Sequence, residues 1–360
     1  MKTILLLCFL FFTVTGCKKN DLPPAVPNSN MYFPPLSGTS WEAISVASLG
    51  WNEGAVQDLY AYLELKKTKG FIILKNGRIV VEKYFGSFNS ESNWYWASAG
   101  KTMTALLVGL AQEEGKLQLG DPTSKYLGTG WSSLPPDKES AITVRHQLSM
   151  TTGLDDGISP DSDCTLPSCL LFKAEAGSRW AYHNAPYTLL TKVVEAATSS
   201  TYNAYFKKKI GDVIGMNSVW IQSGYNNVHY STTRSATRFG LLLLNRGTWD
   251  GMKLLKDDAF FTSQTNSSQS LNPSYGYLTW LNGKAGYMLP SLQTRFPGAL
   301  MPQAPADLYA ALGKNDQKIY VVPSQQLVVV RFGEAADNGM LAVSSFDNEL
   351  WGKLKTVIGY

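Results

Sequence analysis

The stretch WASAGKTMTALLVGLAQ, from Trp96 to Gln112, places a lysine near the start of an apolar helix. Its large apolar residues recur at the i, i+3, i+4, i+7 spacing that predicts a core-facing helix; they are Met103, Leu106, Leu107 and Leu110. Ser98 falls at the N-terminus of this helix, and Lys101 follows three residues later. Because a buried charge is costly, Lys101 is either a solvated surface residue or a residue held there for chemistry.

Ser98 and Lys101 form an S-x-x-K pair, and no other serine of the sequence has a lysine at this spacing. Three residues apart on a helix, their Cβ atoms lie about 5–6 Å apart on one face. A serine hydroxyl needs a base to become a nucleophile. Lysine can be that base when burial or nearby positive charge lowers its pKa from about 10.4 toward neutrality. The alternative interpretation is a helix-capping serine beside a surface lysine.

A second polar pair lies in the stretch AGSRWAYHNAPYTLL (176–190), just before another apolar helix. If the segment is extended, Tyr182 and Asn184 point the same way and His183 points the other way. We expect Tyr182 to relay a proton to the leaving group and Asn184 to orient the lysine and a substrate carbonyl. His183 is interpreted as a structural or surface residue. The run Tyr225-Asn226-Asn227 is a rival Y-x-N, ranked lower because no apolar helix follows it.

Strand patterns flank this central region on both sides. A helix over 55–68, ending near Gly70, precedes a predicted hairpin over 71–85, whose Asn76-Gly77 is a strong turn signal. A second hairpin is predicted over 318–332, followed by a final helix over 345–359. Helical segments separated by loops fill roughly 120–230, and another amphipathic helix covers 231–247. The pattern predicts an α+β fold with an inserted helical lobe.

The first residues are typical of an export signal rather than of the folded domain. Residues 1–16 contain Lys2, a short apolar run and small residues before Cys17. This end resembles a bacterial lipoprotein cleavage box, which predicts lipidation of Cys17; an ordinary signal peptide cut nearby is the alternative. The proline-rich stretch 17–40 is interpreted as a tether, and 41–360 as the folded domain. We therefore expect an exported protein anchored by lipid to a bacterial membrane, on its periplasmic or cell-surface side.

Composition narrows the function classes. Hydrophobic content of 44% and charged content of 17% are globular values, and a net charge of +4 gives little support to nucleic-acid binding. The three histidines have no ligand-spaced partner, so we expect no metal and no cofactor. Cys164 and Cys169 lie in DCTLPSC, and in an oxidising compartment a disulfide closing this short loop is plausible.

The motifs Ser98-x-x-Lys101 and Tyr182-x-Asn184 resemble those of the serine beta-lactamase and penicillin-binding protein superfamily. The closer resemblance is to its class-C-like branch, which includes esterases and 6-aminohexanoate-oligomer hydrolases. The resemblance covers roughly residues 50–335 and implies a mostly antiparallel β-sheet flanked by helices plus a helical lobe, with a cleft between them. Four longer stretches agree with it: DPTSKYLG (121–128), ITVRHQLSMTTGLDDG (142–157), RSATRFGLLLLNRGTWDGMKLL (234–255) and QKIYVVPSQQLVVVRFG (317–333).

The third motif of that superfamily, K-T-G or H-x-G, is altered in this chain. The matching residues are Ala311, Leu312 and Gly313, so alanine replaces the usual lysine or histidine. The glycine still permits a close backbone approach. The resemblance implies an oxyanion hole formed by the backbone N–H groups of Ser98 and Lys314. The missing lysine weakens the case for a substrate that carries a carboxylate.

The sequence therefore predicts a lipid-anchored serine hydrolase that cleaves a small ester, amide or peptide-like substrate. Ser98 would form the acyl-enzyme, Lys101 would act as base and Tyr182 would relay the proton. One alternative is a beta-lactamase or D-alanyl-D-alanine carboxypeptidase. Another is a binding or sensor lipoprotein that uses the same fold without catalysis.

Overall fold

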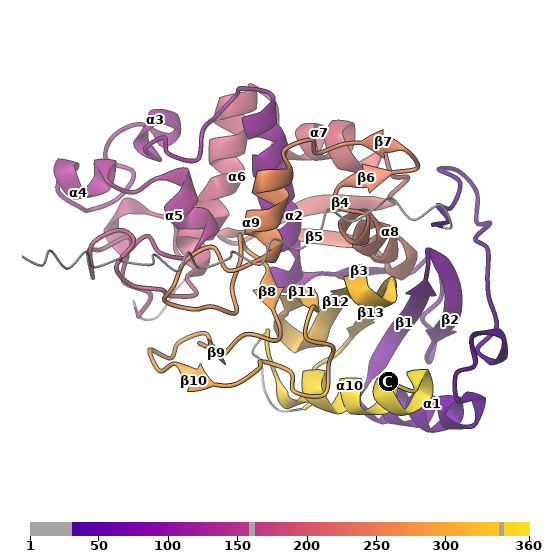
Figure 1. Cartoon of the computed structure of the whole chain (residues 1–360). Helices are drawn as coiled ribbons and strands as arrows, with labels where there is room; N and C mark the ends of the chain where they lie inside the picture. Colours follow the sequence, from indigo (N-terminus) through magenta and orange to yellow (C-terminus); the bar gives the residue numbers. More distant parts are fainter. Residues whose placement is uncertain (1–30, 158–162, 338–341) are drawn as a thin grey trace, which may run out of the picture. The chain divides into compact units, whose positions relative to one another are not determined.

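The computed structural model describes residues 31–157, 163–337 and 342–360. Its centre is a six-stranded sheet in the order β2-β1-β13-β12-β11-β8, with every neighbouring pair antiparallel (Figure 1). The strands are β1 Thr68–Lys75, β2 Arg78–Tyr84, β8 Trp280–Leu281, β11 Tyr309–Gly313, β12 Gln317–Val322 and β13 Leu327–Gly333. The first and last parts of the chain thus share one sheet, as the pattern of strands predicts.

Both predicted hairpins form. Asn76 and Gly77 connect β1 to β2 with φ angles of 50° and 78°, the left-handed values that a tight two-residue turn requires. Residues Pro323–Gln325 make the short turn between β12 and β13. In β13 every residue is buried, because helices cover both faces of the sheet.

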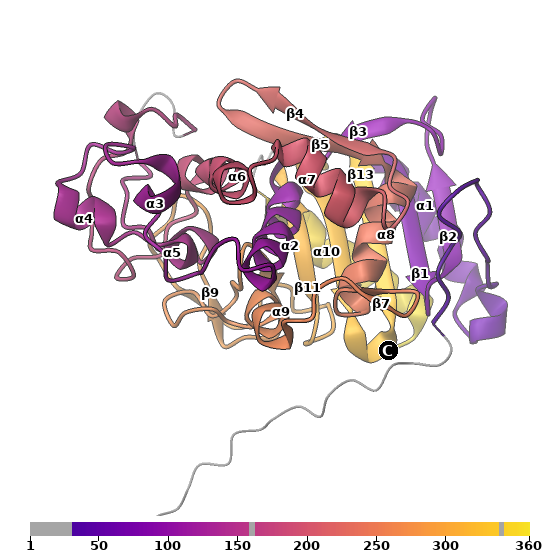
Figure 2. The same ribbon diagram turned by 90° about the horizontal axis from the view of Figure 1, so that it is seen from above.

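Two pairs of helices cover the sheet. Helices α1 (Val56–Leu65) and α10 (Ser345–Ile358) lie on one face, while α2 (Gly100–Glu113) and α8 (Thr233–Leu244) lie on the other (Figures 1 and 2). Helix α8 packs on β13, β12 and β1, and α2 also contacts β11. Helix α2 is buried along nearly its whole length, because the sheet lies on one side of it and the lobe on the other.

The lobe beside α2 is helical only in part. Its helices are α3 Ser124–Leu127, α4 Pro136–Ser140, α5 Val144–Leu148, α6 Asn184–Thr198 and α7 Tyr202–Phe206. The last part of the region 120–230, which was predicted to be helical, is instead a hairpin of β4 (Ser218–Ser223) and β5 (Asn226–Thr232). Together with β3 (Asn93–Tyr95) they make a separate three-stranded sheet. Of the rival motif, Tyr225 lies in the turn between β4 and β5, whereas Asn226 and Asn227 begin β5.

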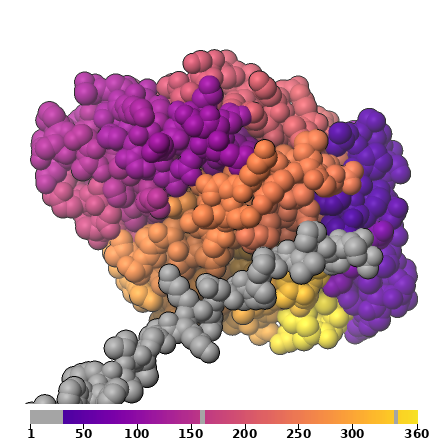
Figure 3. All heavy atoms as spheres, turned by 45° about the horizontal axis from the view of Figure 1, so that its top comes forward, coloured from indigo at the N-terminus to yellow at the C-terminus, as the bar shows by residue number. Residues whose placement is uncertain are grey.

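The segment 248–300 completes the domain next to the lobe. It contains α9 (Asp258–Thr265) and the short strands β6 Thr248–Trp249, β7 Met252–Lys253, β9 Gly286–Tyr287 and β10 Phe296–Pro297. The Leu278 N–H donates to the Leu148 carbonyl over 2.9 Å, and Arg145 donates to the Tyr277 hydroxyl over 2.6 Å. In the space-filling view this segment, coloured orange, borders the lobe directly (Figure 3).

Two predicted boundaries are wrong. Helix α1 ends at Leu65, and Lys67 takes the left-handed φ of 55°, so Gly70 is no helix stop but part of β1. A Cβ on Gly70 would stand 2.3 Å from Thr233 Oγ1, so this glycine allows α8 to approach the sheet.

The last ten residues of the predicted tether pack on the domain. The Tyr32 N–H donates to the Asn76 carbonyl over 3.0 Å. Arg238 donates to the Pro35 carbonyl over 2.6 Å. The predicted signal 1–16, Cys17 and the rest of the tether lie outside the described residues. Within the described ranges, no helix is both long enough and apolar enough to cross a bilayer.

Candidate active site

Ser98 and Lys101 lie where a short 3-10 turn, Ala97–Ala99, leads into α2. The Lys101 ammonium donates a hydrogen bond to Ser98 Oγ over 2.9 Å. Lys101 is 3% exposed, whereas Ser98 is partly open to solvent. The alternative of a solvated surface lysine is therefore wrong. Ala97, directly before the serine, has a φ of 47°, a left-handed backbone value that is unfavourable for a residue with a side chain.

The surroundings of Lys101 favour its neutral form. Burial lowers the pKa of the Lys101 ammonium to about 7, and the negative charge of Asp163 opposes part of that fall. The ammonium also lies 4.1 Å from the ring centroid of Tyr187 and 5.1 Å from that of Tyr182. These aromatic faces attract a cation but are weak substitutes for water. A substantial fraction of Lys101 is thus uncharged near neutral pH, as a base must be.

Tyr182 points its hydroxyl toward the same place from an aromatic cluster. Its ring stacks on Trp280 at 5.7 Å and meets Tyr275 edge-on at 6.1 Å. Burial raises the pKa of the Tyr182 hydroxyl, and interaction with Ser98 opposes part of that rise. The hydroxyl is buried and makes no well-formed hydrogen bond to the described residues. Tyr182 is therefore a neutral phenol near the serine, with its hydrogen-bonding capacity still available.

Asn184 lies close by, but not in the predicted orientation. The extended segment ends at His183, with φ −116° and ψ 119°, and Asn184 is already the first residue of α6. Its amide Nδ2 donates to Asp163 Oδ1 over 2.7 Å. One amide hydrogen of Asn184 is thus donated to Asp163, a contact that the sequence did not predict. His183 is buried, so of the two interpretations offered for it the structural one holds.

Strand β11 brings the altered third motif against the serine. A Cβ on Gly313 would stand 2.3 Å from the Trp96 carbonyl oxygen and 3.2 Å from the Ser98 nitrogen. Only glycine permits this approach. Lys314 follows directly and opens the turn Lys314–Asp316. Ala311, two residues earlier on the same face of the strand, is 1% exposed.

Buried charges hold the turn that follows β11. Lys318 Nζ lies 3.1 Å from Asp316 Oδ1 and 2.9 Å from Asp347 Oδ2. Arg331 donates to the carbonyl oxygens of Asn315 and Asp316 over 3.1 and 3.0 Å. This network holds the backbone of the turn Lys314–Asp316, which follows the strand beside Ser98.

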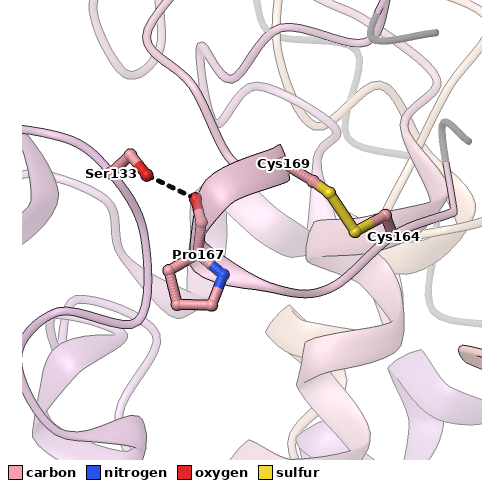
Figure 4. The surroundings of a disulfide bond; sticks show 4 residues. All are labelled: Ser133, Cys164, Pro167 and Cys169. Atoms are coloured by element: carbon pink, nitrogen blue, oxygen red, sulfur yellow. Dashed lines mark hydrogen bonds between the residues drawn. A yellow bond between two sulfur atoms is a disulfide. The ribbon is translucent and has the colours of Figure 1, made fainter.

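Cys164 and Cys169 are joined by a disulfide (Figure 4). The bridge closes a loop of the lobe, and the Ser133 hydroxyl donates to the Pro167 carbonyl inside that loop over 2.6 Å. Asp163 directly precedes the first cysteine. The loop therefore reaches the site through Asp163.

Two residues beside the predicted pair, Asp163 and Tyr187, were not predicted from the sequence. Asp163 accepts Nδ2 hydrogen bonds from Asn184 and, over 2.7 Å, from Asn226, while Tyr187 lies under the lysine. Asn226 belongs to the rival Y-x-N that was ranked lower. Tyr187 follows the Y-x-N motif by one helical turn, a spacing that could have indicated it. Asp163 carries no local signal, because only folding brings it to Asn184.

The model of the beta-lactamase family matches residues 67–340 of this chain. The chain belongs to the beta-lactamase family. An uncharacterized protein of Alkalihalophilus pseudofirmus is 24% identical over 314 residues, which cover 75% of this chain and 87% of that relative. The teichoic acid D-alanine hydrolase of Staphylococcus aureus is 26% identical over 160 residues, 42% of this chain and 40% of the relative.

Solved structures share this fold. A protein from Bacillus anthracis, assigned as a 6-aminohexanoate-dimer hydrolase, superposes with a TM-score of 0.64 at 19% identity, covering 82% of this chain and 80% of its own. The predicted superfamily and fold class are therefore confirmed. Among residues 31–157, 163–337 and 342–360, no group of three or more His, Cys, Asp or Glu side chains could hold a metal ion.

Proposed function

We propose that this member of the beta-lactamase family is a serine hydrolase that cleaves an ester or amide bond through an acyl-enzyme on Ser98. The observation that carries the proposal is the 2.9 Å contact between Lys101 Nζ and Ser98 Oγ, with the lysine buried. A buried amine next to a partly exposed hydroxyl is a base beside a nucleophile. Membership of the family supports hydrolysis, as does the teichoic acid D-alanine hydrolase among the relatives.

The proton moves in a closed cycle. Neutral Lys101 takes the proton of the Ser98 hydroxyl as Oγ bonds to the substrate carbonyl carbon. The tetrahedral intermediate then breaks its bond to the leaving group, which receives a proton through the Tyr182 hydroxyl. In the second half, water attacks the carbonyl carbon of the acyl-enzyme and gives a proton to Lys101. The bond to Ser98 Oγ then breaks, and Oγ receives that proton, which regenerates the Ser98 hydroxyl and neutral Lys101. The backbone N–H groups of Ser98 and Lys314 are proposed to bind the oxyanion.

The altered third motif argues for substrates without a carboxylate beside the acyl group. A lysine at position 311 would supply a charged hydrogen bond worth about 1.5–3 kcal/mol, and alanine removes it. Esters and uncharged amides lose nothing by the change. We expect kcat/KM for a short-chain p-nitrophenyl ester to exceed that for a chromogenic cephalosporin. A preference for the cephalosporin would instead support the beta-lactamase interpretation.

Covalent labelling tests the nucleophile. A fluorophosphonate probe should modify the wild-type protein at Ser98, as located by peptide mass spectrometry. Ser98→Ala should lose both labelling and esterase activity, while Ser270→Ala, which removes an exposed hydroxyl, should keep both. Labelling of Ser98→Ala at the wild-type rate would refute the mechanism. Circular dichroism of each variant separates lost chemistry from lost folding.

We further propose that the chain is exported and held to a bacterial membrane by lipid on Cys17. The support is the sequence of residues 1–17 alone, with its short apolar run ending at a cysteine. A lipid anchor places the catalytic domain on the periplasmic or cell-surface side, where small ester or amide substrates would reach it.

A further inference from the structure

Asp163 links three parts of the molecule at the edge of the site. Its Oδ1 accepts from Asn184 at the start of α6, and its Oδ2 accepts from Asn226 at the start of β5, each over 2.7 Å. Thr188 of α6 donates to the Asn226 amide oxygen over 3.3 Å, which fixes the orientation of that second amide. Asp163 is thus the acceptor on which two carboxamides converge.

The disulfide loop fixes the position of this carboxylate. Cys164, the next residue, is buried and bonded to Cys169. The loop is fastened to the rest of the lobe by the Ser133 N–H, which donates to the Leu170 carbonyl over 3.1 Å, and by the Ser133 hydroxyl on Pro167. The backbone on the C-terminal side of Asp163 therefore has little freedom to move away from α6.

This arrangement decides which way Asn184 faces. An ionised carboxylate only accepts hydrogen bonds, so Asn184 must turn its NH2 group toward Asp163. The amide oxygen Oδ1 then points away, and it is buried with no partner among the described residues. A buried acceptor of this kind is suited to an N–H of the substrate or to the Lys101 ammonium.

The charge of Asp163 also acts on the base. It is the carboxylate whose attraction opposes the loss of the proton from Lys101. Among the described residues, the rings of Tyr182 and Tyr187 also lie against the lysine; burial raises the pKa of both phenols, so they stay neutral. Burial therefore makes the larger change to the pKa of Lys101, and the charge of Asp163 makes a smaller change in the opposite direction.

We propose that Asp163 is a positioning residue of the hydrolase, which orients Asn184 and tunes Lys101, and that the Cys164–Cys169 disulfide holds it in place. This inference rests on the proposed function. It makes the redox state of a loop outside the catalytic motifs a determinant of the reaction.

The pH profile of Asp163→Asn tests the first half of the proposal. Without the negative charge, Lys101 loses its proton more readily, so the acid limb of kcat/KM should move to lower pH by about 0.5–1 unit. The value of kcat should fall about tenfold because Asn184 is no longer held. Asp155→Asn, at a carboxylate of the same lobe paired with Lys173, should change neither. Asp163→Glu should restore the acid limb, since it restores the charge.

The second half is tested by removing the disulfide. Cys164→Ser with Cys169→Ser should move the acid limb in the same direction as Asp163→Asn, by a smaller amount. Added to the cysteine variant, Asp163→Asn should then move it less than it does in the wild type, because two changes that act through one contact are not additive. Full additivity would overturn the role of the disulfide.

An acid limb of Asp163→Asn that superimposes on the wild type would overturn the role of Asp163. If Asp163 were purely structural, its replacement by asparagine would lower the melting temperature and the fraction of protein labelled by fluorophosphonate. The acid limb of kcat/KM would then not move. Should Asp163→Asn fail to fold, the cysteine variant still tests the proposal, because an acid limb that superimposes on the wild type there would overturn it. Loss of activity in Ser98→Ala, measured alongside, shows that the proposed hydrolase stands even if this inference fails.

Discussion

At the scale of single residues, the unusual feature is Lys101, a lysine that the fold buries away from solvent. Solvation normally keeps a lysine charged, and Lys101 has exchanged water for two aromatic rings and a serine hydroxyl. In the proposed mechanism this cost in stability has a function, because a charged lysine cannot take a proton from Ser98. The burial that destabilises the charged form of Lys101 is thus the same property that would let it act as a base.

The pH dependence of activity follows from the neutral form of Lys101. Burial lowers the pKa of its ammonium to about 7, so kcat/KM should rise with pH through about 7 and level off above 8. Lys101→Ala should lose about 10²–10⁴-fold in kcat, the usual worth of a general base. Lys116→Ala, at an exposed lysine just beyond α2, is the matched control and should behave as wild type. A flat profile between pH 5.5 and 8 would argue against Lys101 as base.

His229 offers a test of stability at the same scale. It is fully buried behind the site, between the rings of Trp96 and Trp220, and neither ring nitrogen finds a hydrogen-bond partner among the described residues. Burial lowers the pKa of its imidazole from 6.5 to about 3. Between these values the unfolded chain binds a proton that the folded protein does not, so stability falls as the pH drops from 6.5 toward 3.

His229→Phe should therefore raise the free energy of unfolding by about 1 kcal/mol at pH 7, since it removes unsatisfied buried polar atoms. The gain should grow as the pH is lowered to 4, because phenylalanine takes up no proton. His146→Phe is the contrast: its Nδ1 accepts from the Thr143 N–H over 3.2 Å, so its loss should destabilise. Melting temperatures across pH 4–8 measure both. A lower melting temperature for His229→Phe at every pH would contradict this account.

At the scale of elements, the decisive contact is that of β11 with the turn before α2. The strand lies so close that its last residue has no room for a side chain, and the buried ions of β12 and β13 hold the following turn in place. In the mechanism we propose, the turn and helix α2 supply the nucleophile and base, while the strand supplies the neighbouring backbone. Neither element forms the site without the other.

Gly313→Ala tests this contact. The new methyl group would meet the Trp96 carbonyl at 2.3 Å and the Ala99 nitrogen at 3.0 Å, and backbone atoms cannot turn aside as a side chain can. We expect a loss of about 1–3 kcal/mol in stability from overpacking and of about 10²-fold or more in the labelling rate of Ser98. Gly120→Ala, where a Cβ meets nothing within 4 Å, should be neutral in both measurements. Equal labelling rates for the two variants would contradict the placement of β11.

At the scale of the whole molecule, the sheet joins the two ends of the folded chain and the lobe is inserted between them. Strands β1 and β13 pair although they are more than 250 residues apart, as the contact of Arg331 with Thr68 illustrates. The N-terminal residues 31–40 add to this body: Arg238 binds carbonyls of Pro34 and Pro35 over 3.4 and 2.6 Å. A tether that begins at Cys17 would thus end at about residue 30.

Cys17→Ala tests the proposed anchor at this scale. In cells that process lipoproteins, the wild-type protein should sediment with membranes, whereas the variant should appear in the soluble fraction. The reason is that the lipid on Cys17 is the anchor we propose for the mature chain. Esterase activity of the variant, measured after purification, should equal that of the wild type and serves as the control for folding. A variant that stays in the membrane pellet would refute the lipid anchor.

The sequence by itself determined the parts that depend on neighbouring residues. These parts are the Asn76-Gly77 turn, the apolar spacing of α2 and the S-x-x-K pair. Each involves residues close together in the sequence, where local chain geometry sets the distances. The resemblance to the family, rather than local spacing, indicated that alanine at position 311 replaces the usual lysine or histidine. Boundaries such as Gly70 were predicted wrongly, because packing against Thr233, not a helix stop, explains that glycine.

Only the tertiary structure decided what surrounds those parts. It showed that Lys101 is buried, that Asn184 turns its amide toward Asp163, and that Asn226 joins them. The last two partners lie 21 and 63 residues from Asp163, and no local pattern indicates such contacts. The depth of burial, and with it the pKa of the base, is a property of all the elements packed around a side chain. Spacing along the chain predicts the groups that react in the proposed mechanism, and packing in three dimensions sets their protonation and orientation.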